Sequence, residues 1–561
     1  MSRARTAKVD DGTFLFFGAI IMLLALGAVV LAAGALAGLI TGGTLAQARG
    51  GLVQSVAHAV TGNLDAAFEP APSPWAFWPL VVALAGGTAA LIVWLARRFG
   101  GRSEGAQWGG RKVETTLRAP HPPAQRQGRI TAGRGQVTKR IVAAKPSISA
   151  TVFGIPGSAK TAGLVLPNAA EWRGPLVVTT TKAADLDVIY ARRAALGPVW
   201  VIAPTGIPGR TTHRWSPVDY ANSPKAADRM AAWMAEASSS GGDKRAAPWV
   251  DQARNVLKGI LLAAHLSGGG VTKMRQWLAL GKDAVDYVVA VLEEYGYNDV
   301  AEDYSGPWLR LHADGIGSIQ FTLNVIARVY SDEEVRDTSA GTDFTVDELL
   351  DRNGTVCLIA NEADAERFAP LLTSIIASII HGAESRYDHT GKALDPMLGI
   401  MVDEAGNMLR YPRLPNILTT GRGMGIVLLT VWHDLSQLRD RLGQQAANTV
   451  LSASGLRMLL PGCGDLETLR YFNGLFGRQL VERASRTSGG GGNNSTQWSH
   501  QETDLAPIHE LQQLPDFTAI AQYSNLPPIK INMRLTFRDR DVKQWLAVPH
   551  QAPATGTEVP R

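Results

Sequence analysis

The segment 154–161 combines residues that could bind a phosphate group. It reads Gly-Ile-Pro-Gly-Ser-Ala-Lys-Thr, after an apolar stretch that predicts a strand and before a stretch that predicts a helix. Loops of the pattern G-x-x-x-x-G-K-[ST] direct backbone N–H groups and a helix N-terminus at a polyphosphate. The lysine binds the terminal phosphates, and the hydroxyl reaches Mg²⁺. The sequence therefore predicts a nucleotide site with Mg²⁺, formed by Gly154, Gly157, Ser158, Ala159, Lys160 and Thr161.

One residue of this loop departs from the pattern. Ala159 stands where the second glycine belongs. Its methyl group would lie close to the β-phosphate, and alanine lacks the conformational freedom of glycine. We therefore expect weakened nucleotide binding and weakened activity. The alternative interpretation is an ordinary turn between a strand and a helix, since such turns are also rich in Gly, Pro and Ser.

Two acidic residues end an apolar run further along the chain. Residues 397–404 read Met-Leu-Gly-Ile-Met-Val-Asp-Glu, which predicts a buried strand followed by Asp403 and Glu404. In this arrangement one carboxylate can bind Mg²⁺ while the next polarises an attacking water, which suits ATP hydrolysis. The alternative is a polar strand end. The presence of the phosphate loop in the same chain favours the hydrolytic interpretation.

An arginine between two glycines precedes the next predicted strand. The residues Gly421-Arg422-Gly423 predict a turn from which the guanidinium of Arg422 could reach a phosphate bound by a neighbouring subunit. The alternative is a solvated surface arginine.

Short apolar runs and helical stretches must position these residues. Alternation of such runs with helical segments predicts a doubly wound α/β core with buried parallel strands. The predicted strands are 175–179, 198–203, 354–360, 397–402, 425–431 and 455–460. Between 220 and 330 the periodicity is helical, which predicts a separate all-α lobe.

Two long apolar stretches, 14–40 and 75–96, predict transmembrane helices of about 40 and 30 Å. Together they predict a hairpin, although a cleaved signal peptide is an alternative for the first. Arg49 is the only lysine or arginine between the spans, whereas several lysines and arginines flank them, which predicts cytoplasmic termini. The flanking residues are Arg3, Arg5, Lys8, Arg97, Arg98, Arg102, Arg111 and Lys112.

Length and composition limit the number of domains and the kinds of partner. A chain of 561 residues predicts two to four compact units. A net charge of +5 permits anionic partners without requiring them. The two cysteines, Cys357 and Cys463, lie far apart in apolar surroundings, so the sequence indicates neither a disulfide framework nor a zinc site. The predicted organisation is a transmembrane hairpin (1–99), a linker (100–140), a nucleotide-binding domain (141–219 and 341–545), an inserted all-α domain (220–340) and a flexible tail (546–561).

Several of these stretches resemble the type IV secretion coupling proteins, the TraG and TraD group of conjugative DNA-transfer ATPases. The most specific segments are 402–407 (Val-Asp-Glu-Ala-Gly-Asn), 421–425 (Gly-Arg-Gly-Met-Gly) and 435–438 (Leu-Ser-Gln-Leu). Supporting matches are 164–168, 215–219 and 526–529. The resemblance covers nearly the whole chain.

This resemblance implies a RecA-like P-loop ATPase with an inserted all-α domain, anchored in the bacterial inner membrane by an N-terminal hairpin. It implies ATP and Mg²⁺ as ligands, a homo-hexamer, and delivery of single-stranded DNA or relaxase-like proteins to the secretion channel. DNA would be bound without sequence preference, and lipids would surround the hairpin. The implied roles are phosphate and Mg²⁺ binding for Lys160 and Thr161, Mg²⁺ binding for Asp403, water activation for Glu404 and an arginine finger for Arg422.

Two further departures from the family accompany Ala159. At His433 the family usually has a glutamine that senses the γ-phosphate. Imidazole can also donate a hydrogen bond, but its charge varies near neutral pH; the alternative role is a polar helix cap. Residues 179–182 read Thr-Thr-Thr-Lys where the family usually has Asp-Pro-Lys, so only Lys182 matches. We therefore leave this segment out of the catalytic set.

Two other functions remain open from the sequence. The chain could be a membrane receptor that recruits substrate proteins through its helical lobe with weak or no ATPase activity, which Ala159 keeps open. It could also be an FtsK-like chromosome translocase, which the run 421–438 and the hairpin disfavour. ATP turnover with and without DNA distinguishes them.

Overall fold

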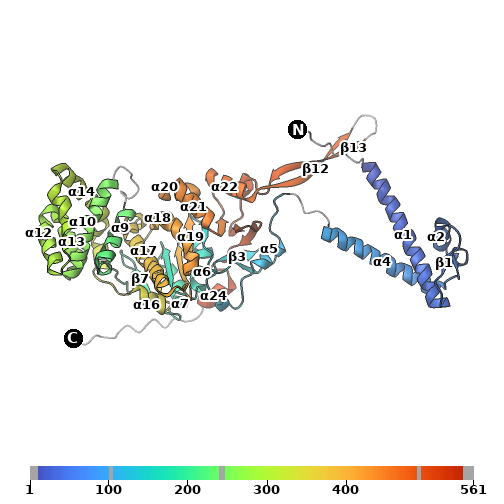
Figure 1. Ribbon diagram of the computed structural model, residues 1–561, viewed down its shortest axis with the longest axis horizontal. Helices are drawn as coiled ribbons and strands as arrows, with labels where there is room; N and C mark the ends of the chain where they lie inside the picture. The colour runs from blue at the N-terminus through green and yellow to red at the C-terminus, as the bar shows by residue number, and fades with distance from the viewer. Residues whose placement is uncertain (1–10, 100–104, 239–246, 489–493, 547–561) are drawn as a thin grey trace. The chain divides into compact units, whose positions relative to one another are not determined.

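The computed structural model describes residues 11–99, 105–238, 247–488 and 494–546 (Figure 1). The chain divides into two compact units, residues 1–104 and 105–561. Four of the basic residues that support the predicted topology, Arg3, Arg5, Lys8 and Arg102, lie outside the described residues, as does the predicted tail from 547 onward.

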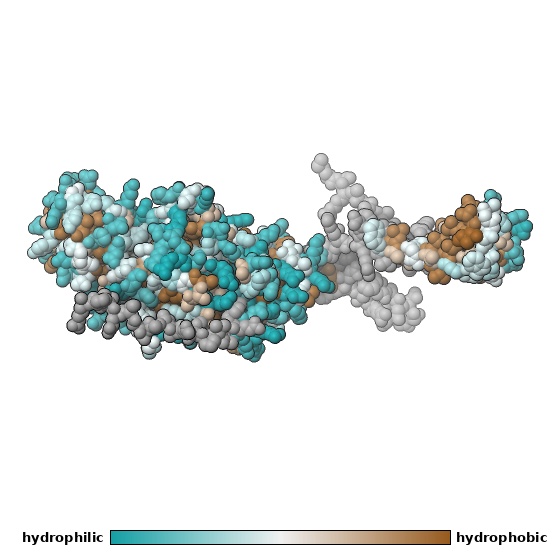
Figure 2. Space-filling view, turned by 90° about the horizontal axis from the view of Figure 1, so that it is seen from below, coloured by the Kyte–Doolittle hydropathy of each residue, from teal (hydrophilic) through white to brown (hydrophobic). Residues whose placement is uncertain are grey.

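The N-terminal unit contains two long apolar helices that pack against each other. Phe68 and Phe77 lie in its small core, with ring centroids 5.9 Å apart. Residues 24–42 and 74–91 are long and apolar enough to cross a membrane. Much of their surface is exposed, and brown patches mark it in Figure 2. The elements are α1 (Asp11–Gly42), β1 (Gln47–Ala48), α2 (Leu52–Val60), α3 (Leu64–Ala67), β2 (Phe68–Glu69) and α4 (Pro74–Phe99).

The second unit is built on a mixed sheet of eleven strands in the order β4-β3-β15-β14-β11-β5-β10-β9-β6-β8-β7. The strands from β11 to β7 are parallel, and the other four extend the sheet in antiparallel pairing. The bounds are β3 (Thr131–Gly135), β4 (Ile141–Ala143), β5 (Ala150–Phe153), β6 (Leu176–Thr180), β7 (Val199–Ile202), β8 (Thr355–Ile359), β9 (Leu398–Val402), β10 (Ile426–Trp432), β11 (Leu456–Leu459), β14 (Thr518–Tyr523) and β15 (Ile529–Asn532).

Burial on both faces of the sheet explains why the central strands are apolar. Every residue of β5, β6, β8, β9 and β10 is buried. Strands covered on both faces read as continuous apolar runs, which is why the sequence predicted them. The prediction of an α/β core is confirmed.

The same unit contains helices before, between and after these strands. They are α5 (Arg111–Thr116), η1 (Pro123–Arg126), the π-helical turn η2 (Thr161–Val165), α6 (Leu166–Glu171), α7 (Asp185–Arg193), α17 (Ala365–Thr390), α18 (Ala405–Met408), α19 (Leu414–Met424), α20 (Leu435–Leu442), α21 (Gln444–Ala453), α22 (Leu466–Phe476), α23 (Ile508–Gln512) and α24 (Arg540–Leu546).

All described elements between β7 and β8 are helices (Figure 1). The helices expected between 226 and 295 are present, and α10 packs against α9, α11, α12, α13 and α14. The bounds are α8 (Pro217–Tyr220), α9 (Pro224–Ala237), α10 (Ala247–Leu266), α11 (Gly270–Leu280), η3 (Gly281–Ala284), α12 (Val285–Glu294), α13 (Asn298–Arg310), α14 (Ala313–Ile326), η4 (Arg328–Ser331), α15 (Glu333–Thr338) and α16 (Val346–Asp351).

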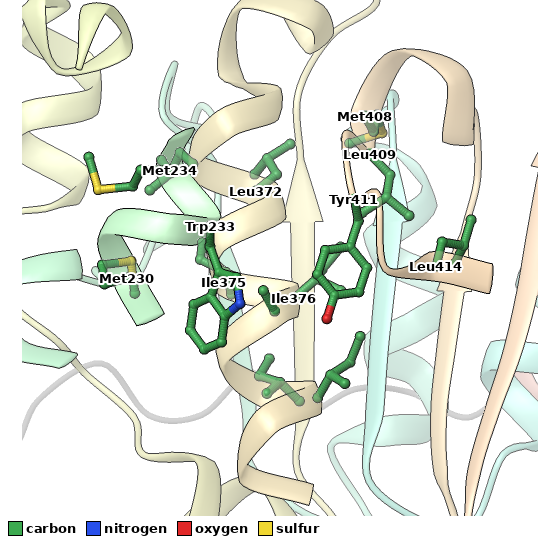
Figure 3. Close-up of a cluster of buried hydrophobic side chains, with 14 of the residues drawn as sticks. Met230, Trp233, Met234, Leu372, Ile375, Ile376, Met408, Leu409, Tyr411 and Leu414 are labelled. Atoms are coloured by element: carbon green, nitrogen blue, oxygen red, sulfur yellow. The ribbon is translucent and has the colours of Figure 1, made fainter. Parts of the chain in front are cut away.

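Helix α17 connects these helices to the core. It is a third segment apolar and long enough to span a membrane, but 72% of it is buried in the fold. Figure 3 shows its Leu372, Ile375 and Ile376 in one cluster with Trp233 of α9 and with Tyr411, which follows α18. Its apolar character therefore reflects packing within the protein.

The predictions for two connecting segments are wrong. The connector predicted for 100–140 contains β3, which pairs with β15 and β4 in the main sheet. Its residues are mostly small, so they gave no apolar pattern. Of the loop predicted for 485–496, residues 485–488 and 494–496 belong instead to two antiparallel strands, β12 (Arg478–Ser488) and β13 (Asn494–Asp504), because backbone pairing does not require apolar side chains. Residues 489–493 lie outside the described residues.

Candidate phosphate-binding site

The predicted site residues follow three neighbouring strands. Strand β5 pairs with β10, and β10 pairs with β9, all parallel. Because parallel strands end at the same edge of the sheet, the loops after Phe153, Val402 and Trp432 meet there. This places Lys160, Asp403–Glu404 and His433 in one cluster.

Close packing shapes the loop after β5. The backbone N–H of Gly154 donates to Trp432 O at 2.9 Å. A Cβ on Gly154 would lie 2.7 Å from both Leu460 Cδ1 and Ser158 Oγ, so a larger residue would displace these side chains. Ser158 Oγ in turn donates to Ile155 O at 2.7 Å. These contacts hold the loop in a compact turn before η2.

Ala159 adopts the backbone conformation of a glycine. Its φ is +61°, next to Gly157 at +86°. For an L-residue with a side chain the left-handed region costs about 1–2 kcal/mol. The sequence predicted that alanine would reduce the conformational freedom of the loop at this position. In the structure, this alanine is held in a strained backbone conformation.

Lys160 and Glu404 form a buried ion pair. Lys160 Nζ lies 2.7 Å from Glu404 Oε1, and His433 Nε2 lies 3.3 Å from Glu404 Oε2. The hydrogen bond from His433 and the ammonium of Lys160 lower the pKa of Glu404 to about 2, against the opposing effect of burial. Glu404 also has a φ of +55°, which is a strained conformation of the kind found at functional sites. The carboxylate is therefore ionised and held between two basic side chains.

Asp403 lies deeper, with 1% of its surface exposed. Its Oδ2 accepts a hydrogen bond from Thr161 Oγ1, and its backbone O accepts one from Thr179 Oγ1 at 3.0 Å. Burial raises the pKa of Asp403 to about 6. Its Oδ1 is buried and has no hydrogen-bond partner in the described part of the chain. A carboxylate with a free buried oxygen beside a threonine hydroxyl offers the hard oxygen ligands that Mg²⁺ prefers.

His433 does not cap the helix that follows it. The cap of α20 is Asp434, whose Oδ1 accepts from the backbone N–H of Gln437 at 2.7 Å. Gln437 Oε1 accepts from the backbone N–H of His433 at 3.0 Å. Gln437 thus supports the position of His433. The run Leu-Ser-Gln-Leu contained this residue, but local pattern alone did not assign it a role.

Arg422 is not part of this cluster. It lies exposed in the last turn of α19, and the predicted turn is wrong because the helix continues to Met424 and ends at Gly425, whose φ is +81°. It precedes β10, whereas His433 follows it. Seven extended residues separate these ends by about 20 Å. Within one chain, Arg422 is therefore at the opposite edge of the sheet from Lys160.

Sequence reasoning left out the end of β6. Thr179 bonds to the backbone of Asp403, and Thr180 Oγ1 donates to Asp185 Oδ2 at 2.5 Å. The signal was the position of Thr180, in the segment where the family usually has Asp-Pro-Lys.

Comparison with known proteins finds that this chain is similar to conjugation proteins. Residues 109–557 match the family model described as type IV secretory system conjugative DNA transfer. The chain is 21% identical over 405 residues to the conjugal transfer protein TraG of Agrobacterium fabrum. That match covers 70% of this chain and 61% of TraG, so the chain spans about three fifths of the length of this relative.

Solved structures share the fold. The bacterial conjugative coupling protein TrwBdeltaN70, in an unbound form, matches with a TM-score of 0.59 and 17% identity, over 78% of this chain and 94% of that one. The plasmid coupling protein TrwB in complex with ADP and Mg²⁺ matches with a TM-score of 0.57 and 17% identity, over 78% of this chain and 95% of that one.

Proposed function

Because the chain belongs to the family of type IV secretory system conjugative DNA-transfer proteins, we propose that it is a membrane-anchored ATPase that drives DNA or DNA–protein substrates toward a secretion channel. The observation that carries this proposal is the cluster of Lys160, Thr161, Asp403 and Glu404 at the carboxyl edge of the sheet. Each of these residues is of a type that phosphoryl transfer requires.

Nucleotide binding would begin at the loop after β5. Backbone N–H groups of 157–161 and the ammonium of Lys160 bind the phosphates. Thr161 and Asp403 would hold Mg²⁺, which neutralises phosphate charge when it is bound. Because Lys160 is paired with Glu404, a phosphate that takes over the ammonium releases one oxygen of this carboxylate. Glu404 then orients the attacking water, while Asn407 Nδ2, which donates to Oε2 at 3.2 Å, and His433 keep this other oxygen in place.

We further propose that Arg422 completes the site of a neighbouring subunit in a homo-hexamer. Arg422 precedes β10, so it lies at the end of the sheet where the parallel strands begin, whereas Lys160 lies where they end. This position supports the proposal, since Arg422 cannot reach Lys160 of the same chain without a large movement. A guanidinium supplied between subunits stabilises the charge of the transition state.

The N-terminal unit would anchor the protein. Helices α1 and α4 are both apolar enough to span a membrane. Arg49 is the only lysine or arginine of the intervening segment 43–73, and basic residues follow α4, so we propose a hairpin in the bacterial inner membrane with both termini in the cytoplasm. The helices of 220–340 would form the inserted domain whose motion moves the substrate.

DNA and relaxase-like proteins are the proposed substrates, and components of the secretion channel are proposed partners. A ring that holds single-stranded DNA through its phosphates shows little sequence preference and a steep dependence on salt. ATP turnover by the purified full-length protein, measured with and without single-stranded DNA, tests the proposal.

A substrate-recruiting receptor with little ATPase activity is the second candidate. The conformation of Ala159 favours it, because the strained loop carries a methyl group where glycine is usual. DNA-stimulated turnover contradicts this candidate. The family match gives the FtsK-like alternative no support.

A further inference from the structure

Asp185 lies next to the acidic pair although it follows a different strand. Thr179 of β6 lies beside Val402 of β9 in their parallel register, so the next residues, Thr180 and Asp403, are also neighbours. Thr180 Oγ1 donates to Asp185 Oδ2 at 2.5 Å, which ties the first residue of α7 to the end of β6. The strand order thus brings a second carboxylate to the side of Asp403.

The surroundings of these two carboxylates leave negative charge unbalanced. The Asp185 side chain is partly buried, and its negative charge acts on Asp403. Lys160, the buried ammonium at this edge, is paired with Glu404. Lys182, whose charge acts on Asp185, is exposed. Since Asp403 Oδ1 is buried without a partner, the cluster has the charge and a free ligand atom for a cation.

Hydrated Mg²⁺ fits such a cluster. This ion keeps several of its waters and is held by one or two carboxylates, and those waters donate hydrogen bonds to acceptors around them. Thr161 Oγ1 and Asp403 already share one hydrogen bond and offer direct ligands. Asp185 follows β6, the strand next to β9, and offers an acceptor beside Asp403.

We propose that Asp185, fixed by Thr180, is a positioning residue that accepts a hydrogen bond from a water on the Mg²⁺ held by Thr161 and Asp403. This inference rests on the proposed function, because it requires a nucleotide–Mg²⁺ complex at the loop after β5. The competing explanation is structural: a carboxylate in the first turn of α7 stabilises that helix end. The two explanations differ in whether the effect of substituting Asp185 on nucleotide binding depends on Mg²⁺.

Binding of a fluorescent ADP analogue separates them. The full-length protein, purified in detergent, is titrated with mant-ADP in EDTA, and then with Mg²⁺ at fixed mant-ADP. Asp185→Asn should leave binding in EDTA unchanged and raise the Mg²⁺ concentration for half-maximal effect about 10-fold or more, as for other residues that support a metal through its ligands. Thr180→Val should shift it in the same direction.

Asp187→Asn is the matched control, since Asp187 is on the same helix but exposed and paired with Arg210. It should behave as wild type. If Asp185→Asn keeps the wild-type Mg²⁺ dependence, or loses binding equally in EDTA and Mg²⁺, the inference is wrong and Asp185 is structural. If the wild-type protein does not bind mant-ADP, or Lys160→Ala binds it equally well, the proposed function itself fails.

Discussion

Lys160 Nζ lies 2.7 Å from Glu404 Oε1, so the residue proposed to bind phosphate holds the residue proposed to orient water. In this arrangement the carboxylate and an incoming phosphate compete for one ammonium. The pair therefore links nucleotide binding to the release of the catalytic carboxylate, and it leads to a first prediction.

Glu404→Gln should separate binding from hydrolysis. The amide keeps the shape of the side chain but removes the charge that competes for Lys160, so affinity for ATP should equal or exceed that of wild type. Turnover should fall by about 10² or more, because the amide cannot act as a base. Equilibrium binding of mant-ATP and phosphate release measure the two effects. A variant that loses affinity and turnover in parallel would show that Glu404 supports the fold of the loop instead.

Ala159→Gly should stabilise the phosphate loop. Removing the methyl group relieves the cost of the left-handed conformation, about 1–2 kcal/mol, and opens space for the phosphates. We expect tighter ATP binding or faster turnover, together with a higher melting temperature. Ala169→Gly is the matched control: it makes the same change in the helical interior of α6, where glycine costs about 1 kcal/mol, so its effect on stability should have the opposite sign. Weaker nucleotide binding by Ala159→Gly would contradict the account of this loop.

Arg422→Ala should bind ATP nearly as well as wild type and hydrolyse it about 10³-fold more slowly or worse. Mixing it with Glu404→Gln subunits should recover some turnover, because some interfaces then combine an intact Glu404 with an intact Arg422. Arg413→Ala, at the other end of α19, serves as the control and should stay active. If mixed rings form but remain inactive at every ratio, Arg422 does not act between subunits.

A reporter fused within residues 43–73 should lie outside the cytoplasm, and reporters after Gly110 or at the C-terminus should lie inside. This follows from the placement of basic residues around α1 and α4. Cell-surface labelling or a pair of compartment-specific reporter enzymes measures it. A cytoplasmic signal from the segment 43–73 would rule out the hairpin.

Sequence patterns predicted the parts of this fold that burial determines. The central strands are fully buried, so their apolar runs stood out, and the helices between 226 and 295 showed their periodicity. The loop at 154–161 and the acids at 403–404 were recognisable because each is contiguous in the chain. Backbone pairing in β3 and in the β12–β13 hairpin left no such signal.

The contacts between distant segments could not be predicted locally. The sheet makes neighbours of Thr180, Asp185 and Asp403 because β6 lies next to β9. The order of the strands cannot be predicted from the sequence of any one segment. The same applies to Arg422: two flanking glycines favoured a turn, but packing of α19 beside β10 keeps them helical. Its proposed role depends on a neighbouring subunit, which no pattern within the chain specifies.

ATP turnover with and without single-stranded DNA tests the central claim most directly, when wild type is compared with Lys160→Ala and with Lys145→Ala, an exposed lysine before β5. We expect DNA to stimulate the wild-type protein, Lys160→Ala to lose turnover by about 10² or more because the phosphates lose their cation, and Lys145→Ala to match wild type. If all three proteins hydrolyse ATP equally, the loop after β5 is not the site of hydrolysis and the proposed motor function is wrong.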